Sequence, residues 1–201
     1  LGPDAPQAVQ RFQRASAQAH QMRWTPQQLE HPEALGPLPG LDLLTPTDQT
    51  VPWLERAADR LEADMPLLMG LIIREAGKSA ANAIAEVREA VDFLRYYADQ
   101  ARQTLDVTHN PLGPVLCISP WNFPLAIFVG QVAAALVAGN SVIAKPAEET
   151  PLIAAEAVRI LHAAGVPTEA LLFMPGDGSI GAALVARPEI AGVMFTGSTE
   201  V

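Results

Sequence analysis

The clearest pattern of apolar and polar positions lies in the second half of the chain. Short apolar runs at 113–119 (GPVLCIS) and 141–145 (SVIAK) contain β-branched residues, which is typical of buried strands. Between them, the alanine-rich segment 125–138 is long enough for a helix, and Gly139 suits the left-handed residue that follows one. Strand, helix and strand in about thirty residues predict a βαβ unit with parallel strands and a right-handed crossover.

The alternation continues towards Val201. Apolar runs at 170–175 (ALLFMP) and 191–197 (AGVMFTG) predict two more strands, and helices are expected to begin at Pro151 and Gly178. Thr150 is a favoured N-cap residue, and proline is favoured in the first helical turn. Strands alternating with helices predict an α/β fold: an open parallel Rossmann-like sheet with helices on both faces, preceded by a helical segment.

The pattern before the strands is helical. Between residues 53 and 76, apolar residues recur at steps of three or four, with a break predicted at Pro66, a cap at Asp64 and an end at Gly77. A second helix is predicted from Asn82 to Gln103. Its apolar stripe is Ile84, Val87, Val91, Leu94, Ala98 and Ala101, and its solvated face is Glu86, Arg88, Glu89, Arg95 and Asp99.

Five prolines within Pro32–Pro52 indicate a loop or linker. We therefore expect three regions. Residues 1–52 are a poorly defined helix and a proline- and glycine-rich linker, 53–110 are a helical segment that packs on the next region, and 111–201 are an α/β domain that is incomplete at its C-terminus.

Composition narrows the classes of function. Hydrophobic residues make up 49% of the chain and charged residues 17%, which predicts a buried core. The net charge of -9, from 22 acidic and 13 basic residues, disfavours nucleic acid as a partner. A single cysteine excludes an intrachain disulfide and suits the cytoplasm. Neither a signal peptide nor a transmembrane segment is expected.

A glycine-rich turn, Gly176 to Gly181, reads G-x-G-x-x-G between a predicted strand and a predicted helix. That is the context of a dinucleotide-binding fingerprint. The fingerprint also needs an acidic residue at the end of the next strand to hold the ribose, and here that strand ends in Phe195, Thr196 and Gly197. A glycine-rich turn that binds no ligand is the alternative.

Lys145 and Glu148, in the segment KPAEE, could replace the missing ribose ligand. An ammonium donates and a carboxylate accepts hydrogen bonds, so the pair suits a ribose diol. A carboxylate would repel a 2′-phosphate, which favours NAD over NADP. The alternative is an exposed salt bridge at the start of a helix.

Two other polar residues follow predicted strands. Ser198 lies at the start of an expected helix, where backbone N–H groups and a hydroxyl can bind phosphate, or where serine is an ordinary N-cap. Asn122 lies between Trp121 and Phe123, and its amide could stabilise a developing oxyanion or cap the turn.

Cys117 is the only thiol, and it lies inside an apolar strand without a nearby cation to lower its pKa. We therefore expect a structural cysteine rather than a nucleophile. Metal-ligand spacing is absent from the histidines, so no metal is expected. These histidines are His20, His31, His109 and His162.

Four motifs together resemble the cofactor-binding half of the aldehyde dehydrogenase superfamily: CISPWNFPL, AGNSVIAKPAEETP, PGDG and FTGSTEV, in this order. The resemblance runs from about Trp53 to the end and is most specific after Pro111. Within it, REAGKSAANAIAEVREAVDFLRYYADQAR is similar to the glutamate-semialdehyde (pyrroline-5-carboxylate) dehydrogenase module of proline utilisation A proteins.

The resemblance implies NAD as the cofactor and a role for each matching residue. Asn122 would stabilise the thiohemiacetal oxyanion, Lys145 and Glu148 would hold the adenosine ribose, and Ser198 would contact the pyrophosphate. Glycines would let the cofactor approach the following helix, and mainly apolar residues would line its cleft. The glycines are Gly178 and Gly181, and the lining residues are Ile118, Ser119, Pro120, Trp121 and Phe195.

In this family the nucleophilic cysteine and the general-base glutamate lie beyond TGSTE, so the 201 residues alone are expected to be inactive. The parent enzyme would oxidise L-glutamate γ-semialdehyde to L-glutamate in proline catabolism, as a homo-oligomer. FAD would belong only to a proline dehydrogenase domain that this sequence does not contain. Another aldehyde substrate, or a non-catalytic nucleotide-binding module, remains the alternative.

Overall fold

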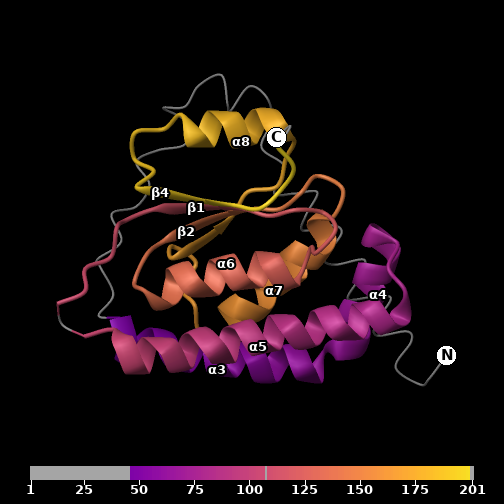
Figure 1. The fold of residues 1–201 in the computed structure, drawn as a ribbon, viewed down its shortest axis with the longest axis horizontal. Coiled ribbons are helices and arrows are strands. Elements are labelled where there is room, and N and C mark those ends of the chain that lie inside the picture. Colours follow the sequence, from indigo (N-terminus) through magenta and orange to yellow (C-terminus); the bar gives the residue numbers. More distant parts are fainter. Residues whose placement is uncertain (1–45, 107, 200–201) are drawn as a thin grey trace.

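Four parallel strands form the centre of the structure (Figure 1). The computed structural model describes residues 46–106 and 108–199, so the helix and linker predicted before residue 46 lie outside the described residues. Along the chain the elements are α3 (Pro46–Ala63), α4 (Met65–Ala76), α5 (Ala80–Thr104), β1 (Val115–Ile118), α6 (Ala126–Val137), β2 (Val142–Lys145), α7 (Pro151–Ala163), β3 (Leu171–Phe173), α8 (Gly178–Val185) and β4 (Gly192–Phe195).

The strand order β3-β2-β1-β4 reverses the direction of winding after β3. Helices α6 and α7 connect β1, β2 and β3 on one face of the sheet, and α8 covers the other face before the chain returns to the far side of β1 (Figure 1). The predicted parallel sheet with helices on both faces is therefore confirmed, with strands shorter than predicted. The carboxyl ends of β1 and β4 flank the point of reversal, where sheets of this type bind ligands.

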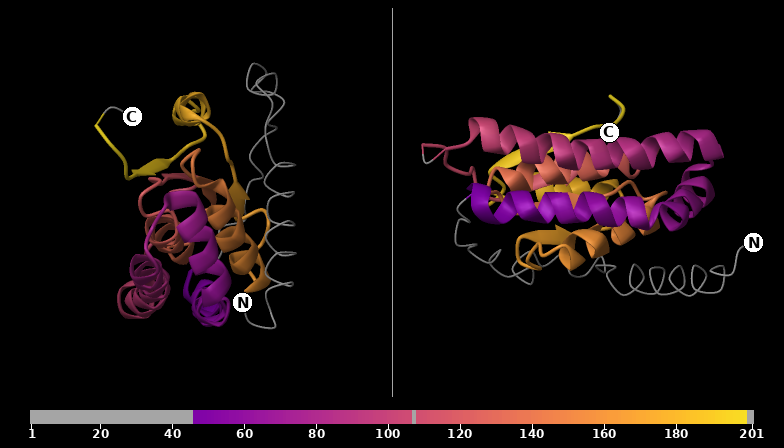
Figure 2. Two further views of the ribbon diagram at one scale, coloured as in Figure 1. Left: turned by 90° about the vertical axis from the view of Figure 1, so that its right-hand side faces the viewer. Right: turned by 90° about the horizontal axis from the view of Figure 1, so that it is seen from below.

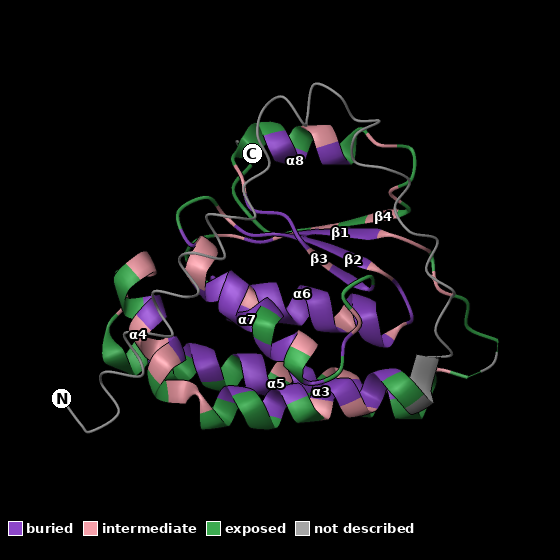
Figure 3. Cartoon of the chain, turned by 180° about the vertical axis from the view of Figure 1, so that it is seen from behind, coloured by how far each residue is buried: buried purple, intermediate pink, exposed green. Residues whose placement is uncertain are grey.

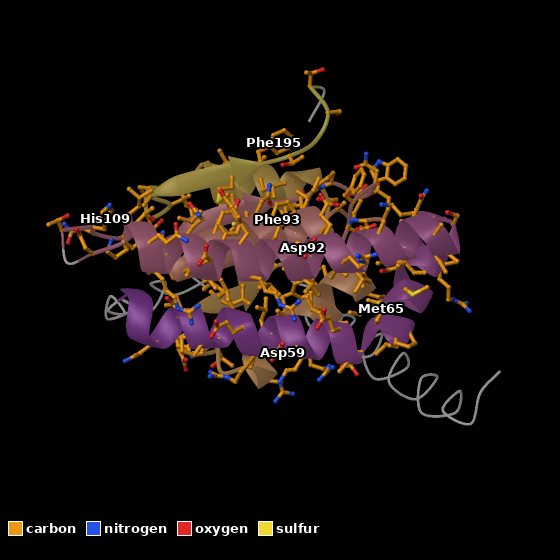
Figure 4. The ribbon with its side chains drawn as sticks, turned by 60° about the horizontal axis from the view of Figure 1, so that its bottom comes forward. Asp59, Met65, Asp92, Phe93, His109 and Phe195 are labelled. Carbon is orange, nitrogen blue, oxygen red and sulfur yellow. The ribbon has the colours of Figure 1, made fainter. Side chains whose placement is uncertain are left out.

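A second helical layer lies beneath α6 and α7. Helices α3 and α5 run side by side there, and α4 lies at one end (Figures 1 and 2). At Gly130 of α6 a side chain would come within 3.0 Å of the ring of Phe93, so the small residue permits this close packing. Phe93 is labelled on α5 in Figure 4. The main core joins this layer to the sheet, and a smaller core lies between the sheet and α8 (Figure 3).

The linker predicted up to Pro52 is wrong for residues 46–52, which belong to α3. Pro52 lacks the N–H that a helix interior uses, a defect that costs about 3 kcal/mol. Tertiary contacts offset it, because Val51 and Leu54 on either side are buried in the core. Thr50 also donates a hydrogen bond to the Val137 carbonyl at 3.2 Å.

The helix predicted at 82–103 is confirmed as α5, but its faces differ from the prediction at two positions. Ile84 is 39% exposed, because small residues such as Ala83 and Ala90 occupy the interface instead. Glu86, predicted to be solvated, is only 1% exposed. Its burial has a specific cause in hydrogen bonds to another helix, described below.

The predicted helix ends are confirmed more often than the predicted caps. Gly77 and Gly139 adopt the left-handed conformation, with φ of 65° and 82°. Asp64 and Thr150 occupy N-cap positions, but neither side chain makes a capping hydrogen bond. Asp64 instead faces Arg159 at 3.5 Å, so a tertiary contact competes with the local one.

We predict that Phe128→Ala lowers the free energy of unfolding by about 3–5 kcal/mol, because the ring is fully buried on α6 and its removal leaves a cavity. Val185→Ala, at an exposed position on α8, is the control and should change it by less than about 0.5 kcal/mol. Urea unfolding followed by circular dichroism measures both. Equal losses in the two variants would contradict the position of the core.

Candidate functional site

All the motifs expected to carry chemistry lie at one edge of the sheet. Because the strands are parallel, the segments that follow β1, β2, β3 and β4 emerge on the same side (Figure 1). These segments are SPWNFP, PAEET, MPGD and TGST. The topology thus gathers four stretches that are far apart in the sequence.

Three predicted site residues lie in one row across the sheet. Ile118, the last residue of β1, is in register with Lys145 on β2 and with Phe195 on β4. Backbone bonds continue the pairing past the strands, since the Ser119 N–H donates to the Lys145 carbonyl and the Thr196 N–H donates to the Ile118 carbonyl. The backbone of this row is therefore rigidly held.

Lys145 is a buried cation at this edge, only 6% exposed. Its ammonium donates to the carbonyl of Gly176 at 2.9 Å and to that of Pro146 at 3.3 Å. Burial lowers its pKa, while the nearby carboxylates of Glu148 and Asp177 act in the opposite direction. Glu148 itself is exposed, so it is available to a ligand.

The glycine-rich turn places α8 against this lysine. A side chain at Gly181 would make ordinary contact with Lys145, 3.4 Å from Cε, and would reach Ile118 at 4.0 Å. At Gly178 nothing lies within 4 Å of such an atom. Asp177 caps α8 by accepting a hydrogen bond from the Ser179 N–H at 2.9 Å, a role signalled in the sequence by an aspartate before a helix.

The loop after β1 carries both buried and exposed groups. Ser119 is buried, and within the described part of the chain its hydroxyl finds no hydrogen-bond partner. Pro120 is half-buried, whereas Trp121 and Asn122 are exposed. The orphaned hydroxyl and the exposed amide are therefore polar groups at this edge that a ligand could engage.

The loop after β4 is contacted by α6 and by the ring of Phe195. Gln131 of α6 donates a hydrogen bond to the hydroxyl of Thr196 at 3.0 Å. The half-exposed ring of Phe195 lies over Gly197, where a side chain would come within 2.6 Å of it. Ser198 is exposed at the end of this turn. Gln131 was not predicted, since it lies in an alanine-rich segment that indicates only a core helix.

Two glutamates of the helical layer, which the sequence analysis assigned to no site, bind the starts of α6 and α7. Glu86 of α5 accepts hydrogen bonds from the N–H groups of Leu125 and Ala126, at the start of α6. Glu75 of α4 accepts from those of Leu152 and Ile153, at the start of α7. Burial raises the pKa of Glu75 and outweighs these bonds, which lower it.

The remaining candidates carry no reactive group. Cys117 is buried in β1, and burial raises the pKa of its thiol to about 12, which agrees with a structural role. Among residues 46–106 and 108–199, no group of three His, Cys, Asp or Glu side chains could hold a metal ion. His20 and His31 lie outside the described residues. No described helix is long and apolar enough to cross a membrane.

Comparison with known proteins gives one consistent result. The model of the aldehyde dehydrogenase family matches residues 44–201. The chain is 74% identical over 148 residues to the bifunctional protein PutA of Rhizobium meliloti, covering 74% of this chain and 12% of that protein. The chain therefore spans about an eighth of the length of this curated relative.

Solved structures agree with the sequence match. A crystal structure of a bifunctional proline utilization A protein is 44% identical, with a TM-score of 0.74, and covers all of this chain and 20% of that one. A 1-pyrroline-5-carboxylate dehydrogenase from Thermus, solved with bound NAD, is 37% identical with a TM-score of 0.72. The match covers 77% of this chain and 33% of that one.

We predict that Cys117 does not react with a thiol reagent in the folded chain. At pH 8 a pKa near 12 leaves almost no thiolate, and the side chain is buried. The absorbance of released thionitrobenzoate measures the reaction, and it should appear only after a denaturant is added. Since this is the only cysteine, rapid labelling of the native chain would show directly that the thiol is accessible.

Proposed function

The chain belongs to the aldehyde dehydrogenase family, and we propose that it forms the NAD-binding part of an L-glutamate γ-semialdehyde dehydrogenase. In the whole reaction, the semialdehyde, water and NAD⁺ give L-glutamate, with its side chain ionised, NADH and two protons. The similarity to PutA and to 1-pyrroline-5-carboxylate dehydrogenases supports this substrate class. It likewise supports a role of the parent protein in proline catabolism.

One observation carries the cofactor assignment: Lys145 is buried at the carboxyl end of β2, close to Gly181 of α8 and to the charge of Glu148. The residues present fit a dinucleotide. Lys145 and Glu148 offer a donor and an acceptor to a ribose diol. Gly178 leaves open space, and Gly181 lets α8 lie close to Lys145. The orphaned Ser119 hydroxyl offers a further polar contact beside them.

The other site residues take complementary roles in this proposal. Ser198 contacts the pyrophosphate, and the remaining positions line the cleft beside the cofactor. Glu148 disfavours a 2′-phosphate by charge repulsion, so NAD is preferred to NADP. The lining positions are Ile118, Ser119, Pro120, Trp121 and Phe195.

When bound, NAD supplies the acceptor for the hydride that leaves the aldehyde carbon. The side-chain amide of Asn122 donates a hydrogen bond to the oxygen on which negative charge develops, and thereby stabilises the transition state. Cys117 does not fit the nucleophile's role, since it is buried and protonated. We therefore assign cofactor binding and oxyanion stabilisation, rather than nucleophilic attack, to the described residues.

The proposal extends to the protein as a whole in three further ways. Residues 53–110 act as a helical support for the NAD-binding region 111–201, the parent protein is a cytoplasmic homo-oligomer, and FAD belongs to a separate proline dehydrogenase domain. A related enzyme for another aldehyde would bind NAD in the same manner. Comparing the rates at which the parent protein forms NADH with several aldehydes would show whether L-glutamate γ-semialdehyde or another aldehyde is its substrate.

We predict that Glu148→Ala weakens NAD binding by about 10- to 100-fold, because hydrogen bonds to a charged group contribute about 1.5–3 kcal/mol. Titration calorimetry of the chain with NAD measures this. Glu149→Ala, at the exposed neighbour, is the matched control and should bind as the unmodified chain does. NADP should bind more weakly than NAD to the unmodified chain, and the difference should narrow in Glu148→Ala. Unchanged NAD affinity in Glu148→Ala would refute the ribose assignment.

We also predict that Gly181→Ala lowers NAD affinity without lowering the free energy of unfolding. The new methyl group makes only ordinary contacts, and alanine favours a helix by about 1 kcal/mol, so the free energy of unfolding should stay the same or rise. NAD affinity should nevertheless fall, since the methyl group packs against Lys145 and Ile118, two residues that the proposal places at the cofactor. Gly70→Ala on α4, where nothing lies within 4 Å, should show the stability effect alone. Equal NAD affinity in both variants would contradict the proposed approach.

A further inference from the structure

Two of the helices that connect strands begin without a cap from their own segment. The N-cap residue of α6 is Leu125, whose side chain cannot accept a hydrogen bond. The N-cap residue of α7 is Thr150, whose buried hydroxyl makes no hydrogen bond within the described part of the chain. The first N–H groups of a helix have no partner inside it, so both helices need an acceptor from elsewhere.

Glu86 supplies that acceptor for α6. Its Oε1 lies 2.8 Å from the Leu125 nitrogen and 3.4 Å from the Ala126 nitrogen. The carboxylate comes from α5, 39 residues earlier in the chain. A buried negative charge at a helix N-terminus is also favoured by the helix dipole.

Lys78 completes this arrangement. Its ammonium pairs with Oε2 of Glu86 and lies 3.8 Å from the centre of the Phe123 ring. One ion pair therefore contacts both the start of α6 and the residue that follows Asn122. The other end of the loop is held by β1, where Ser119 is hydrogen-bonded to β2.

Glu75 plays the equivalent part for α7. Its two oxygens accept hydrogen bonds from Leu152 and Ile153, at 2.8 Å and 2.7 Å. It comes from α4, 77 residues before Leu152. The loop between β2 and α7, which carries Glu148, is thus held by Lys145 in the strand at one end and by Glu75 at the other.

We propose that Glu86 and Glu75 are positioning residues: each ties one functional loop at the carboxyl edge of the sheet to the helical layer beneath it. Glu86 positions Asn122, and Glu75 positions Glu148. The inference rests on the function proposed above for Asn122 and Glu148, whose side chains are exposed. A cap within the loop would stabilise the helix alone, whereas an acceptor from α4 or α5 also fixes the loop relative to the rest of the molecule.

The two glutamates allow a crossed experiment on the chain. Glu86→Ala and Glu75→Ala are compared by ¹⁵N relaxation at the backbone amides of Asn122 and Glu148. Glu86→Ala should lower the order parameter of Asn122 from about 0.85 towards 0.6 and leave that of Glu148 unchanged, and Glu75→Ala should do the reverse. Glu89→Ala, at an exposed position of α5, should change neither.

NAD affinity gives an independent measurement. Glu75→Ala should weaken binding by about three- to tenfold, because a loosened Glu148 loses conformational freedom when it binds. Glu86→Ala loosens the loop that carries the lining residues Pro120 and Trp121, which make no charged hydrogen bond to NAD in the proposal, so it should weaken binding by a smaller factor than Glu75→Ala. If the unmodified chain does not bind NAD, the proposed function fails, whereas the crossed pattern of loop order still decides whether the glutamates position the loops.

Conservative variants keep the test decisive if an alanine variant does not fold. Glu86→Gln keeps an amide oxygen for both N–H groups but loses the ion pair with Lys78, so it should restore part of the order at Asn122. Glu75→Gln keeps one acceptor for two N–H groups, so order at Glu148 should be only partly restored. The proposal is overturned if a substitution of Glu86 or of Glu75 lowers the order of both loops, or of neither. The glutamates would then be general stabilisers of the fold.

Discussion

The free N–H groups at helix N-termini are the constraint on which this structure depends. Each connection between strands of the parallel sheet requires a helix, and each helix begins at the edge where the loops lie. Helix α8 meets the requirement locally, through Asp177. Helices α6 and α7 meet it with carboxylates from α5 and α4. The sheet and the lower helical layer are thus joined by directed polar contacts as well as by apolar packing.

Local patterns predicted the elements of the fold, because their causes are local. The four strands and the helices between them follow from apolar runs, prolines and glycines near their ends. The order of the strands was not predicted, since it depends on which side of β1 the last strand joins. Pro52 was misread for a related reason: burial of Val51 and Leu54 outweighs the local penalty of a proline inside a helix.

The residues of the site likewise divide into those that local patterns predict and those that only tertiary packing explains. Lys145, Glu148 and Gly181 could be identified because they follow strands or begin a helix, positions that place them at one edge. Glu86 could not, since periodicity assigns a glutamate to the solvated face of its helix. Its burial becomes explicable only when Leu125 and Lys78 are placed around it, and these contacts depend on the packing of α5 against α6.

The distribution of charge explains why the helical layer cannot be separated from the sheet at little cost. Without α4 and α5, four N–H groups at the starts of α6 and α7 would lose their acceptors. Conversely, Glu86 is buried, and without α6 its charge would keep only Lys78 as a partner. Each layer therefore supplies hydrogen-bond partners that the other needs, and a donor or acceptor left without one is costly. Helices α4 and α5 are thus joined to α6 and α7 by hydrogen bonds as well as by apolar packing.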